Sequence, residues 1–248
     1  MTSPDSENEL SPSWVFENPY NVVDHSARIT ADYQARARFE REMVSAQQCA
    51  EVLAPLVKEK MTLLDAGCGM GHLFHSFRTR DIDVDYHGID VSAKMIGDGR
   101  SIMKGYGLPP EQLRQLPMEY LEERFDIVVC MNTLTHLPDY HIYLEKLLIS
   151  ARKYLYLRMS MSDFAETKYV FDRPLDPGVD LKLYFNTYEL SEVTEFIKSY
   201  GFEVTRIRDA WNNDEPEQDD VGYTYYRKVF LCTRVSYEKI LKYGASAS

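Results

Sequence analysis

The sequence has few cysteines, and their spacing fits neither a metal site nor a disulfide framework. The four, Cys49, Cys68, Cys130 and Cys232, lie far apart in a chain of 248 residues, which is typical of buried thiols in a reducing compartment. The six histidines are scattered too, without the two-apart or four-apart spacing that puts two ligands on one strand or helix. We therefore expect no metal site.

Long apolar runs and basic runs are also missing. No stretch approaches the roughly 20 apolar residues of a membrane span, and the first residues, Met1–Asp5, lack the basic and apolar regions of a signal peptide. A net charge of −11, with no lysine- or arginine-rich block against it, repels a phosphate backbone. These absences predict a cytoplasmic protein with no membrane and no nucleic acid among its partners.

The composition is that of a folded domain, since 44% of the residues are hydrophobic and the length allows one core with a small cap. Residues 1–13 are rich in Ser, Pro, Asp and Glu and are predicted to be disordered. Residues 14–60 are predicted to form an N-terminal helical cap, because apolar residues recur at helical spacing between residues 26 and 55. The main domain is expected over residues 61–248.

From residue 62 onward, strand and helix patterns alternate. Strands are expected near 62–66, 84–90, 112–116, 125–131 and 153–159, and helices over 71–80, 92–105 and 138–150. This order predicts a doubly wound α/β fold, a mostly parallel sheet with helices on both faces. Pro174, Pro177 and Gly178 break the alternation, so residues 160–187 are interpreted as a lid insertion. A helix over 188–200 and strands over 202–207 and 223–235 follow.

The most informative segment runs from Leu63 to Gly71 and is followed by an apolar run that stops at Asp90. Gly67, Gly69 and Gly71 allow a tight loop whose main chain a ligand can touch. Asp90 follows Gly71 at the roughly 20-residue spacing at which an acid can hold two ribose hydroxyls. Strand, glycine loop, helix, strand and acid together predict a nucleoside-binding site.

The acid that opens the loop, Asp65, argues against a dinucleotide. A carboxylate beside the loop repels a pyrophosphate, whereas it can face the ammonium group of an amino-acid moiety or orient loop amides. Here the sequence resembles the class I S-adenosylmethionine-dependent methyltransferases over Asp65–Gly71, Gly88–Ser92 and Phe125–Pro138. The resemblance implies a Rossmann-like, seven-stranded sheet with an antiparallel last strand, S-adenosyl-L-methionine as cofactor and S-adenosyl-L-homocysteine as product.

The resemblance also assigns the cofactor site. In chain order, the residues predicted to form it are Tyr20, Asp65, Gly67, Cys68, Gly69, Gly71, Asp90, Val91, Met95, Met118, Glu119 and Asn132. Alternatives stay open for several of them: Cys68 as a small residue that fits the loop, Asp90 as a helix cap, Met95 as core and Asn132 as a turn residue. Pro117 stands where the family often has an acid, so the adenine contact is expected to shift to Met118 and Glu119.

The predicted acceptor end has one candidate base and four candidate binding residues. His136 is suited to general-base catalysis because its unperturbed pKa lies around 6.5; capping a helix or packing under the lid is the alternative. Tyr33, Tyr184 and Tyr188 are expected at the substrate chamber, with ordinary packing as the alternative. Arg158 is expected to bind an anionic acceptor or to form a salt bridge.

These residues predict a methyltransferase that acts on an oxygen or nitrogen of a small metabolite, such as a sugar, a sugar nucleotide or a natural-product intermediate. One alternative is a protein or nucleic-acid methyltransferase, against which the acidic balance counts. Another is a non-catalytic partner subunit that binds S-adenosylmethionine. Assembly as a homodimer is left open.

Overall fold

The protein is described by a computed structural model over residues 26–171, 176, 181–219 and 222–235. A central sheet has the strand order β3-β2-β1-β4-β5-β12-β9, and β8 pairs with β5 off this path. The strands of the sheet are β1 (Met61–Ala66), β2 (Val84–Asp90), β3 (Leu113–Gln115), β4 (Phe125–Met131), β5 (Ala151–Ser162), β8 (Tyr188–Glu189), β9 (Phe202–Ile207) and β12 (Arg227–Arg234). Two short pairs lie outside it: β6 (Tyr169–Phe171) with β7 (Lys182–Tyr184), and β10 (Glu217–Gln218) with β11 (Thr224–Tyr225).

Strands β1 to β5 are parallel, and β12 runs antiparallel to both of its neighbours, β5 and β9. The path therefore confirms the predicted mostly parallel sheet of seven strands with an antiparallel last strand. The short β8 adds an eighth strand that the sequence did not reveal.

The helices are α3 (Ala27–Ala37), α4 (Val44–Leu53), α5 (Leu73–Arg78), α6 (Ala93–Met103), α7 (His141–Ser150) and α8 (Leu190–Ser199). Single 3-10 turns occur at η1 (Ala54–Leu56), η2 (Lys104–Tyr106), η3 (Pro110–Gln112), η4 (Met118–Tyr120) and η5 (Leu134–His136).

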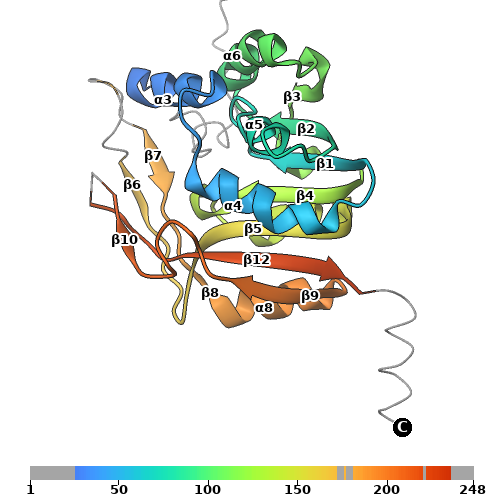
Figure 1. The fold of residues 1–248 in the computed structure, drawn as a ribbon. Helices are drawn as coiled ribbons and strands as arrows, with labels where there is room; N and C mark the ends of the chain where they lie inside the picture. Colours follow the sequence, from blue (N-terminus) through green and yellow to red (C-terminus); the bar gives the residue numbers. More distant parts are fainter. Residues whose placement is uncertain (1–25, 172–175, 177–180, 220–221, 236–248) are drawn as a thin grey trace, which may run out of the picture.

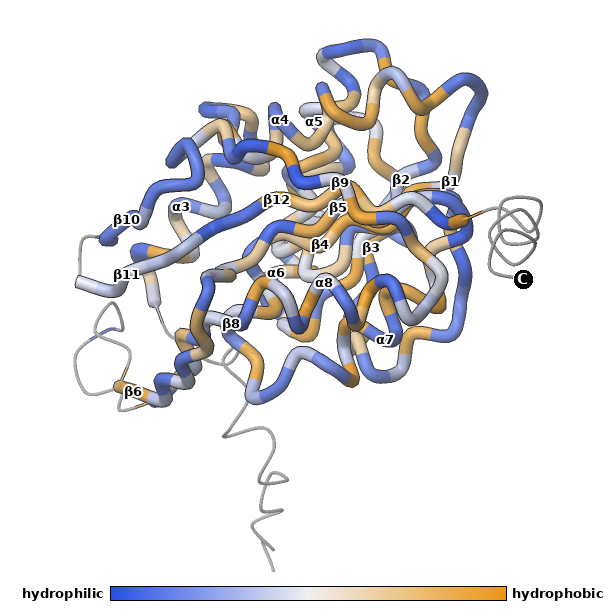
Figure 2. Tube along the Cα trace, turned by 90° about the horizontal axis from the view of Figure 1, so that it is seen from below, coloured by the Kyte–Doolittle hydropathy of each residue, from blue (hydrophilic) through white to orange (hydrophobic). Residues whose placement is uncertain are grey.

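The helices cover both faces of the sheet. Successive side chains of a strand point to opposite faces, so neighbouring strand residues belong to different apolar clusters. Leu64 and Val128 belong to one apolar cluster, which α7 and α8 complete. Leu63 and Ile127 belong to the other, which α4, α5 and α6 complete. Apolar residues follow the central strands in Figure 2, whereas the outer loops are mostly hydrophilic.

Several boundaries differ from the expected ones, each for a local reason. The helix expected from residue 138 begins at His141, where the Asp139 carboxylate accepts from the His141 amide at 2.7 Å. The strand expected to end at 159 continues to Ser162, because β12 pairs with it as far as Ser160. The strand expected over 223–235 is interrupted at Tyr226, whose amide donates to the Ser160 hydroxyl at 3.0 Å.

The carboxyl ends of the parallel strands carry the added segments. Because β12 is antiparallel and its arrow points to the right in Figure 1, the parallel strands end on the left, where α3, β6, β7 and β10 gather. Helices α3 and α4 lie within the predicted cap, β6 and β7 lie within the predicted insertion, residues 160–187, and β8 follows it. The predicted disordered tail, residues 1–13, lies outside the described residues.

Candidate active site

The loop between β1 and α5 is folded as its glycines require. The amides of Gly67 and Cys68 donate to the Ile89 carbonyl at 2.9 and 3.0 Å, which ties the loop to β2. Gly67 has φ +80° and Gly69 has φ +55°, in the left-handed region that favours glycine. A Cβ on Gly67 would lie 2.1 Å from Thr133 Oγ1, and one on Gly69 would lie 2.4 Å from Tyr33 Cε1. Both positions therefore need glycine for space as well as for conformation.

Asp90 joins the loop to the helix that follows. Its Oδ2 accepts from the Gly69 amide at 2.8 Å and its Oδ1 from the Ser92 amide at 2.9 Å. The N-cap of α6 is Ser92, whose hydroxyl accepts from the Met95 amide at 2.9 Å. Asp90 is thus held by backbone donors at the end of β2, at the edge of a cavity, with 7% of its surface exposed.

Asp65 is a buried carboxyl group that forms no ion pair with any of the described residues. The Tyr86 hydroxyl donates to its Oδ2 at 2.6 Å. Burial raises the pKa of Asp65 to about 7, the hydrogen bond from Tyr86 opposes this and the charge of Asp90 adds to it. A cation placed against Asp65 would be stabilised by the carboxylate and would lower its pKa again.

Two neighbouring hollows lie at the carboxyl ends of the strands. The larger is a cavity of about 270 Å³ between the glycine loop, α3, the end of β4 and the β7 segment. The smaller lies between the ends of β2 and β3 and the turn after β4. Gly67, Asp90 and Thr133 line both, so the two hollows adjoin at these residues.

Most of the predicted cofactor residues line these hollows. Asp65, Gly67, Cys68, Gly69, Asp90, Met95 and Asn132 line the larger cavity, and Val91, Met118 and Glu119 line the smaller hollow. Gly71 lines neither; a Cβ on it would lie 2.9 Å from Leu113 Cδ2, so it allows close packing of the loop on β3. Tyr20 lies outside the described residues.

Among the predicted acceptor residues, Tyr33 and His136 line the larger cavity. His136 Nδ1 lies 2.9 Å from the Tyr184 carbonyl oxygen, which can only accept, so the proton of the neutral ring is on Nδ1. Burial lowers the pKa of His136 to about 4, despite the favourable contact with that carbonyl. The ring is therefore neutral near pH 7, with the Nε2 lone pair free of any partner among the described residues.

The other three predicted acceptor residues do not reach the cavity. Arg158 has 3% of its surface exposed, and its Nε lies 2.5 Å from Asp209 Oδ2, so the salt-bridge alternative is the one observed. The Tyr188 hydroxyl is buried against the carbonyls of Leu134 and Leu137, at 3.1 Å from each. Tyr184 stacks on Tyr169 with ring centroids 4.4 Å apart.

Residues that the sequence argument did not single out complete the lining. They include Arg36 and His72 beside the glycine loop, Thr133 after β4, and Leu183 and Phe185 around β7. Arg36 was within reach of sequence reasoning, since it lies one helical turn after Tyr33 and thus on the same face of α3. Leu183 and Phe185 were not, because only the pairing of β6 with β7 decides which alternate residues face inward.

The described residues contain neither a metal-binding cluster nor a membrane-spanning helix. No cluster of three or more His, Cys, Asp or Glu side chains in that part of the chain is arranged to hold a metal ion. Within the same residues, no helix has the length and apolar character needed to cross a bilayer.

The fold and the cofactor-side geometry define a class of protein. Residues 64–154 match a family described as a methyltransferase domain, and the sheet order, glycine loop and strand-end acid are those of a Rossmann-like nucleoside-binding fold. The predicted Rossmann-like fold is thereby confirmed, and the match over residues 64–154 supports the predicted resemblance to class I S-adenosylmethionine-dependent methyltransferases.

Individual relatives are similar only in part or only in fold. The ubiquinone biosynthesis O-methyltransferase of Acinetobacter baumannii strain AYE is 35% identical over 81 residues, 31% of this chain and 33% of that protein. The chain thus spans about a third of the length of this curated relative.

Among solved structures, an S-adenosylmethionine-dependent methyltransferase from Clostridium acetobutylicum ATCC 824 has a TM-score of 0.61 at 13% identity, covering 88% of this chain and all of that one. A 1,6-didemethyltoxoflavin-N1-methyltransferase from Burkholderia thailandensis, solved with its acceptor and S-adenosylhomocysteine, has a TM-score of 0.56 at 16% identity and covers 95% and 94% of the two chains. At these identities the likeness shows the fold alone.

Proposed function

We propose that the protein binds S-adenosylmethionine and transfers its methyl group to an oxygen or nitrogen of a small metabolite. The observation that carries the proposal is the pair of neighbouring hollows, both lined by Asp90. S-adenosylmethionine has a matching arrangement, because its ribose lies between the adenine and the methionine chain.

The residues around the smaller hollow suit an adenine ring, which would widen the present space of about 20 Å³ as it binds. The hollow is lined by Val91, Met118 and Glu119 together with Leu116 and Leu137, so it offers apolar walls and polar groups at one edge. The Asp90 carboxylate, already oriented by two amides, lies where the ribose hydroxyls would donate to it.

The larger cavity suits the zwitterionic end of the cofactor. Asp65 can face the ammonium group, and Arg36 is the one Lys or Arg among the described lining residues. The Nε atom of Arg36 is buried with no hydrogen-bond partner among the described residues, while its guanidinium lies 4.8 Å over the Tyr33 ring and pairs with Asp32. A carboxylate beside Arg36 would supply an acceptor in the low-dielectric surroundings where the pair is strongest.

The remaining end of the cavity favours a small acceptor with an apolar, planar part. Leu183, Phe185 and Tyr225 line it with His136 and Asp219. No lysine or arginine side chain among the described residues lines that end, which counts against the diphosphate of a sugar nucleotide. An aromatic natural-product intermediate fits this lining better.

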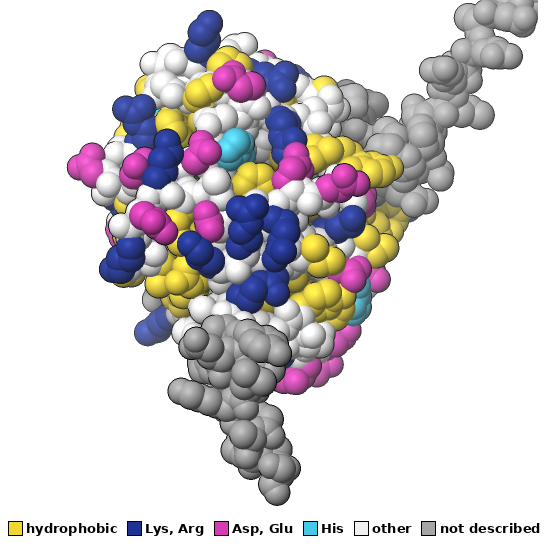
Figure 3. All heavy atoms as spheres, turned by 90° about the vertical axis from the view of Figure 1, so that its right-hand side faces the viewer, with side chains coloured by type: hydrophobic (Ala, Val, Ile, Leu, Met, Phe, Trp, Pro, Cys, Tyr) yellow, Lys and Arg dark blue, Asp and Glu magenta, His cyan; other side chains and the backbone are white. Residues whose placement is uncertain are grey.

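A macromolecular substrate is the less favoured alternative. Figure 3 shows Lys and Arg side chains gathered near the centre of one face. The surface therefore has a locally basic area although the net charge of the chain is −11. That face is the right-hand side of Figure 1, where the parallel strands begin, whereas the cavity lies at their carboxyl ends. Location in the cytoplasm and assembly as a homodimer remain predictions.

Calorimetric titration of the purified protein with S-adenosylmethionine, S-adenosylhomocysteine, methylthioadenosine and NAD tests the cofactor. We expect micromolar binding of the sulfur nucleosides and none of NAD. Asp90→Ala should weaken binding of all three sulfur nucleosides by about 1.5–3 kcal/mol, or roughly 10- to 150-fold. Arg36→Met should weaken S-adenosylhomocysteine but not methylthioadenosine, which lacks the amino-acid end.

Arg28→Met is the matched control, since Arg28 lies on the exposed side of α3 and does not line the cavity. Binding of NAD, or no binding of any sulfur nucleoside by the folded protein, would overturn the proposed function. Release of S-adenosylhomocysteine in the presence of small hydroxylated or amino acceptors separates an enzyme from a non-catalytic partner subunit.

A further inference from the structure

The buried ion pair of Arg158 and Asp209 lies directly behind the cavity. Arg158 is on β5 and has 3% of its surface exposed, and Asp209, after β9, is fully buried. Arg158 Nε lies 2.5 Å from Asp209 Oδ2 and Nη2 lies 3.2 Å from Oδ1, so the guanidinium donates two hydrogen bonds to the carboxylate. The pairing lowers the pKa of Asp209 against the effect of burial, so this carboxyl group stays charged.

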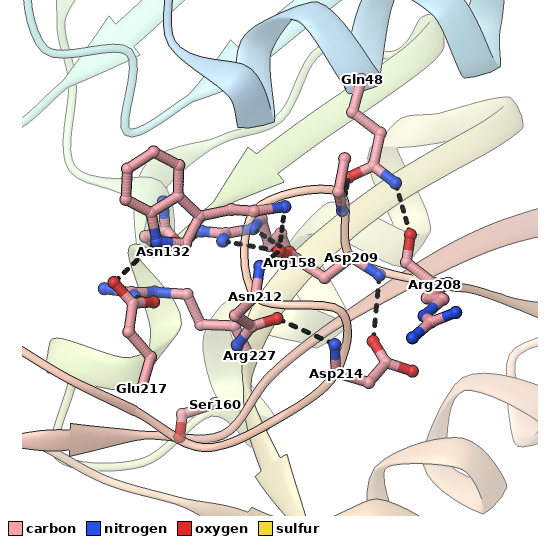
Figure 4. A network of polar contacts seen from close by, with 12 residues as sticks. Gln48, Asn132, Arg158, Ser160, Arg208, Asp209, Asn212, Asp214, Glu217 and Arg227 are labelled. Carbon is pink, nitrogen blue, oxygen red and sulfur yellow. Dashed lines mark hydrogen bonds and ion pairs between the residues drawn. The ribbon is translucent and has the colours of Figure 1, made fainter.

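Asp209 is itself fixed from several sides. Its Oδ1 accepts from the amides of Trp211 and Asn212 at 2.9 and 3.1 Å, and its own amide donates to Asp214 Oδ1 at 3.0 Å. Gln48 on α4 brackets the same loop: its Nε2 donates to the Arg208 carbonyl at 2.6 Å and its Oε1 accepts from the Ala210 amide at 3.0 Å. Figure 4 shows this network converging on Arg158.

The third donor of Arg158 is directed at the active site. Its Nη1 lies 2.5 Å from Asn132 Oδ1, and the Asn132 amide donates to the Arg158 carbonyl at 2.7 Å. Asn132 lines the cavity and has φ +62°, a left-handed conformation that asparagine tolerates better than most residues. Two contacts with one arginine therefore fix both the backbone and the side chain of Asn132.

This contact settles which side of the Asn132 amide faces the cavity. A guanidinium has donors only, so the group against it must be the amide oxygen. The Nδ2 group, which has no partner among the described residues, is left for the cavity as a hydrogen-bond donor. His136, four residues on, supplies the opposite polarity there, since its Nε2 can only accept.

We propose that the Arg158–Asp209 pair is a positioning device that holds Asn132 as a donor beside the His136 acceptor, and that this arrangement selects a hydroxyl group as the methyl acceptor. The inference rests on the proposed function and narrows its oxygen-or-nitrogen choice to oxygen. A hydroxyl oxygen can accept from Asn132 with one lone pair and attack with another. A neutral amine nitrogen has a single lone pair, which a hydrogen bond from Asn132 would occupy.

The hydroxyl oxygen forms a bond to the methyl carbon as the carbon–sulfur bond breaks, and the electron pair of that bond returns to sulfur, which becomes the neutral thioether of S-adenosylhomocysteine. The hydroxyl proton moves to His136 Nε2 and leaves from there to solvent.

The first test observes the amide itself and needs no acceptor. In a proton–nitrogen spectrum, the Asn132 side-chain signals are identified as those missing from Asn132→Asp. They should be displaced from the positions of an unfolded asparagine, and should return toward them in the double variant Arg158→Met with Asp209→Asn. This variant removes both charges but keeps an oxygen for the Trp211 and Asn212 amides. Unperturbed signals in the wild type, or no change in the double variant, would overturn the positioning role.

The second test measures release of S-adenosylhomocysteine with matched pairs of small aromatic acceptors that carry either a hydroxyl or an amino group, such as catechol and its diamine. We expect the hydroxyl members to react at least tenfold faster. In the double variant the turnover number should fall at least tenfold while S-adenosylhomocysteine affinity stays within threefold. Arg80→Met with Glu42→Gln, a charge pair away from the cavity with Nη1 2.6 Å from Oε1, is the control and should change neither.

Equal or faster methylation of the amino members would overturn the oxygen preference. A double variant that turns over like the wild type would overturn the role of the ion pair. Failure of the wild type to bind S-adenosylmethionine would instead overturn the proposed function, so the two failures are distinguishable.

Discussion

At the scale of single residues, Asp65 is a buried carboxyl group that would bind a cationic ligand but that lowers the stability of the fold when it is ionised. It has 3% of its surface exposed, its hydrogen-bond partner is the neutral Tyr86 hydroxyl, and its pKa is raised to about 7 by burial. An ionised carboxylate in this position costs stability, which a bound ammonium group would restore.

This cost predicts a pH dependence of stability. An aspartate in the unfolded chain ionises near its ordinary pKa of 3.8, whereas folded Asp65 keeps its proton until about pH 7. The contribution of Asp65 to the free energy of unfolding is therefore full below pH 4 and is lost as the pH rises toward 7. Relative to Asp65→Asn, the wild type should lose about 2–4 kcal/mol over this interval.

Urea unfolding of both proteins at a series of pH values measures the difference. Glu59→Gln, at an exposed position outside both hollows, is a control for the loss of one carboxylate. Parallel curves for the wild type and Asp65→Asn would show that Asp65 ionises normally in the folded protein.

At the scale of elements, the contact between α3 and the glycine loop closes the cofactor side of the cavity. Tyr33 occupies the space beside Gly69, and the end of α3 is tied to α5 by His75 Nε2, 2.7 Å from the Ala37 carbonyl. Gln34 Nε2 reaches Asp98 on α6 at 3.3 Å. Helix α3, which covers the glycine loop, is thus anchored to both α5 and α6.

This packing predicts coupling between Gly69 and Tyr33. Gly69→Ala should be costly in the wild type, because the new Cβ meets the tyrosine ring in addition to the left-handed backbone. In a Tyr33→Ala background only the backbone cost, about 1 kcal/mol, should remain. The two substitutions should therefore couple by about 1–3 kcal/mol in a double-mutant cycle of urea unfolding. Equal costs in the two backgrounds would argue against the contact.

At the scale of the whole molecule, the core is two apolar clusters, one on each face of the sheet. Tyr156 on β5 belongs to one of them and is fully buried, yet its hydroxyl has no hydrogen-bond partner among the described residues. Burial also raises the pKa of this hydroxyl. A polar atom without a partner in the core lowers the stability of the fold.

Tyr156→Phe should therefore leave the protein equally stable or stabilise it by about 1 kcal/mol. The free energy of unfolding in urea measures this, and Tyr188→Phe is the matched comparison. Tyr188 is as large, and its hydroxyl bonds to two carbonyls, so its loss should destabilise the protein. A loss of stability in Tyr156→Phe comparable to that of Tyr188→Phe would show that the Tyr156 hydroxyl has a partner.

The accuracy of the sequence predictions depended on how local the determining interactions are. Strands β4 and β9 begin and end where their apolar patterns predict, at Phe125–Met131 and Phe202–Ile207. The glycine loop and Asp90 were also identified, because one turn and its spacing to the next strand define them. Tyr184 was expected at the cavity, but its neighbours Leu183 and Phe185 line it instead, since a shift of one residue in a strand exchanges its two faces.

By itself, the sequence determined the order of strands and helices, the nucleoside-binding loop and the acid that faces it. These follow from backbone preferences, apolar periodicity and short spacings along the chain. Only the tertiary structure decided that Arg158 is paired with Asp209 rather than directed into the cavity, and that Asn132 offers its donor side. Both outcomes depend on contacts between residues 51 and 26 positions apart, which no local pattern in the sequence encodes.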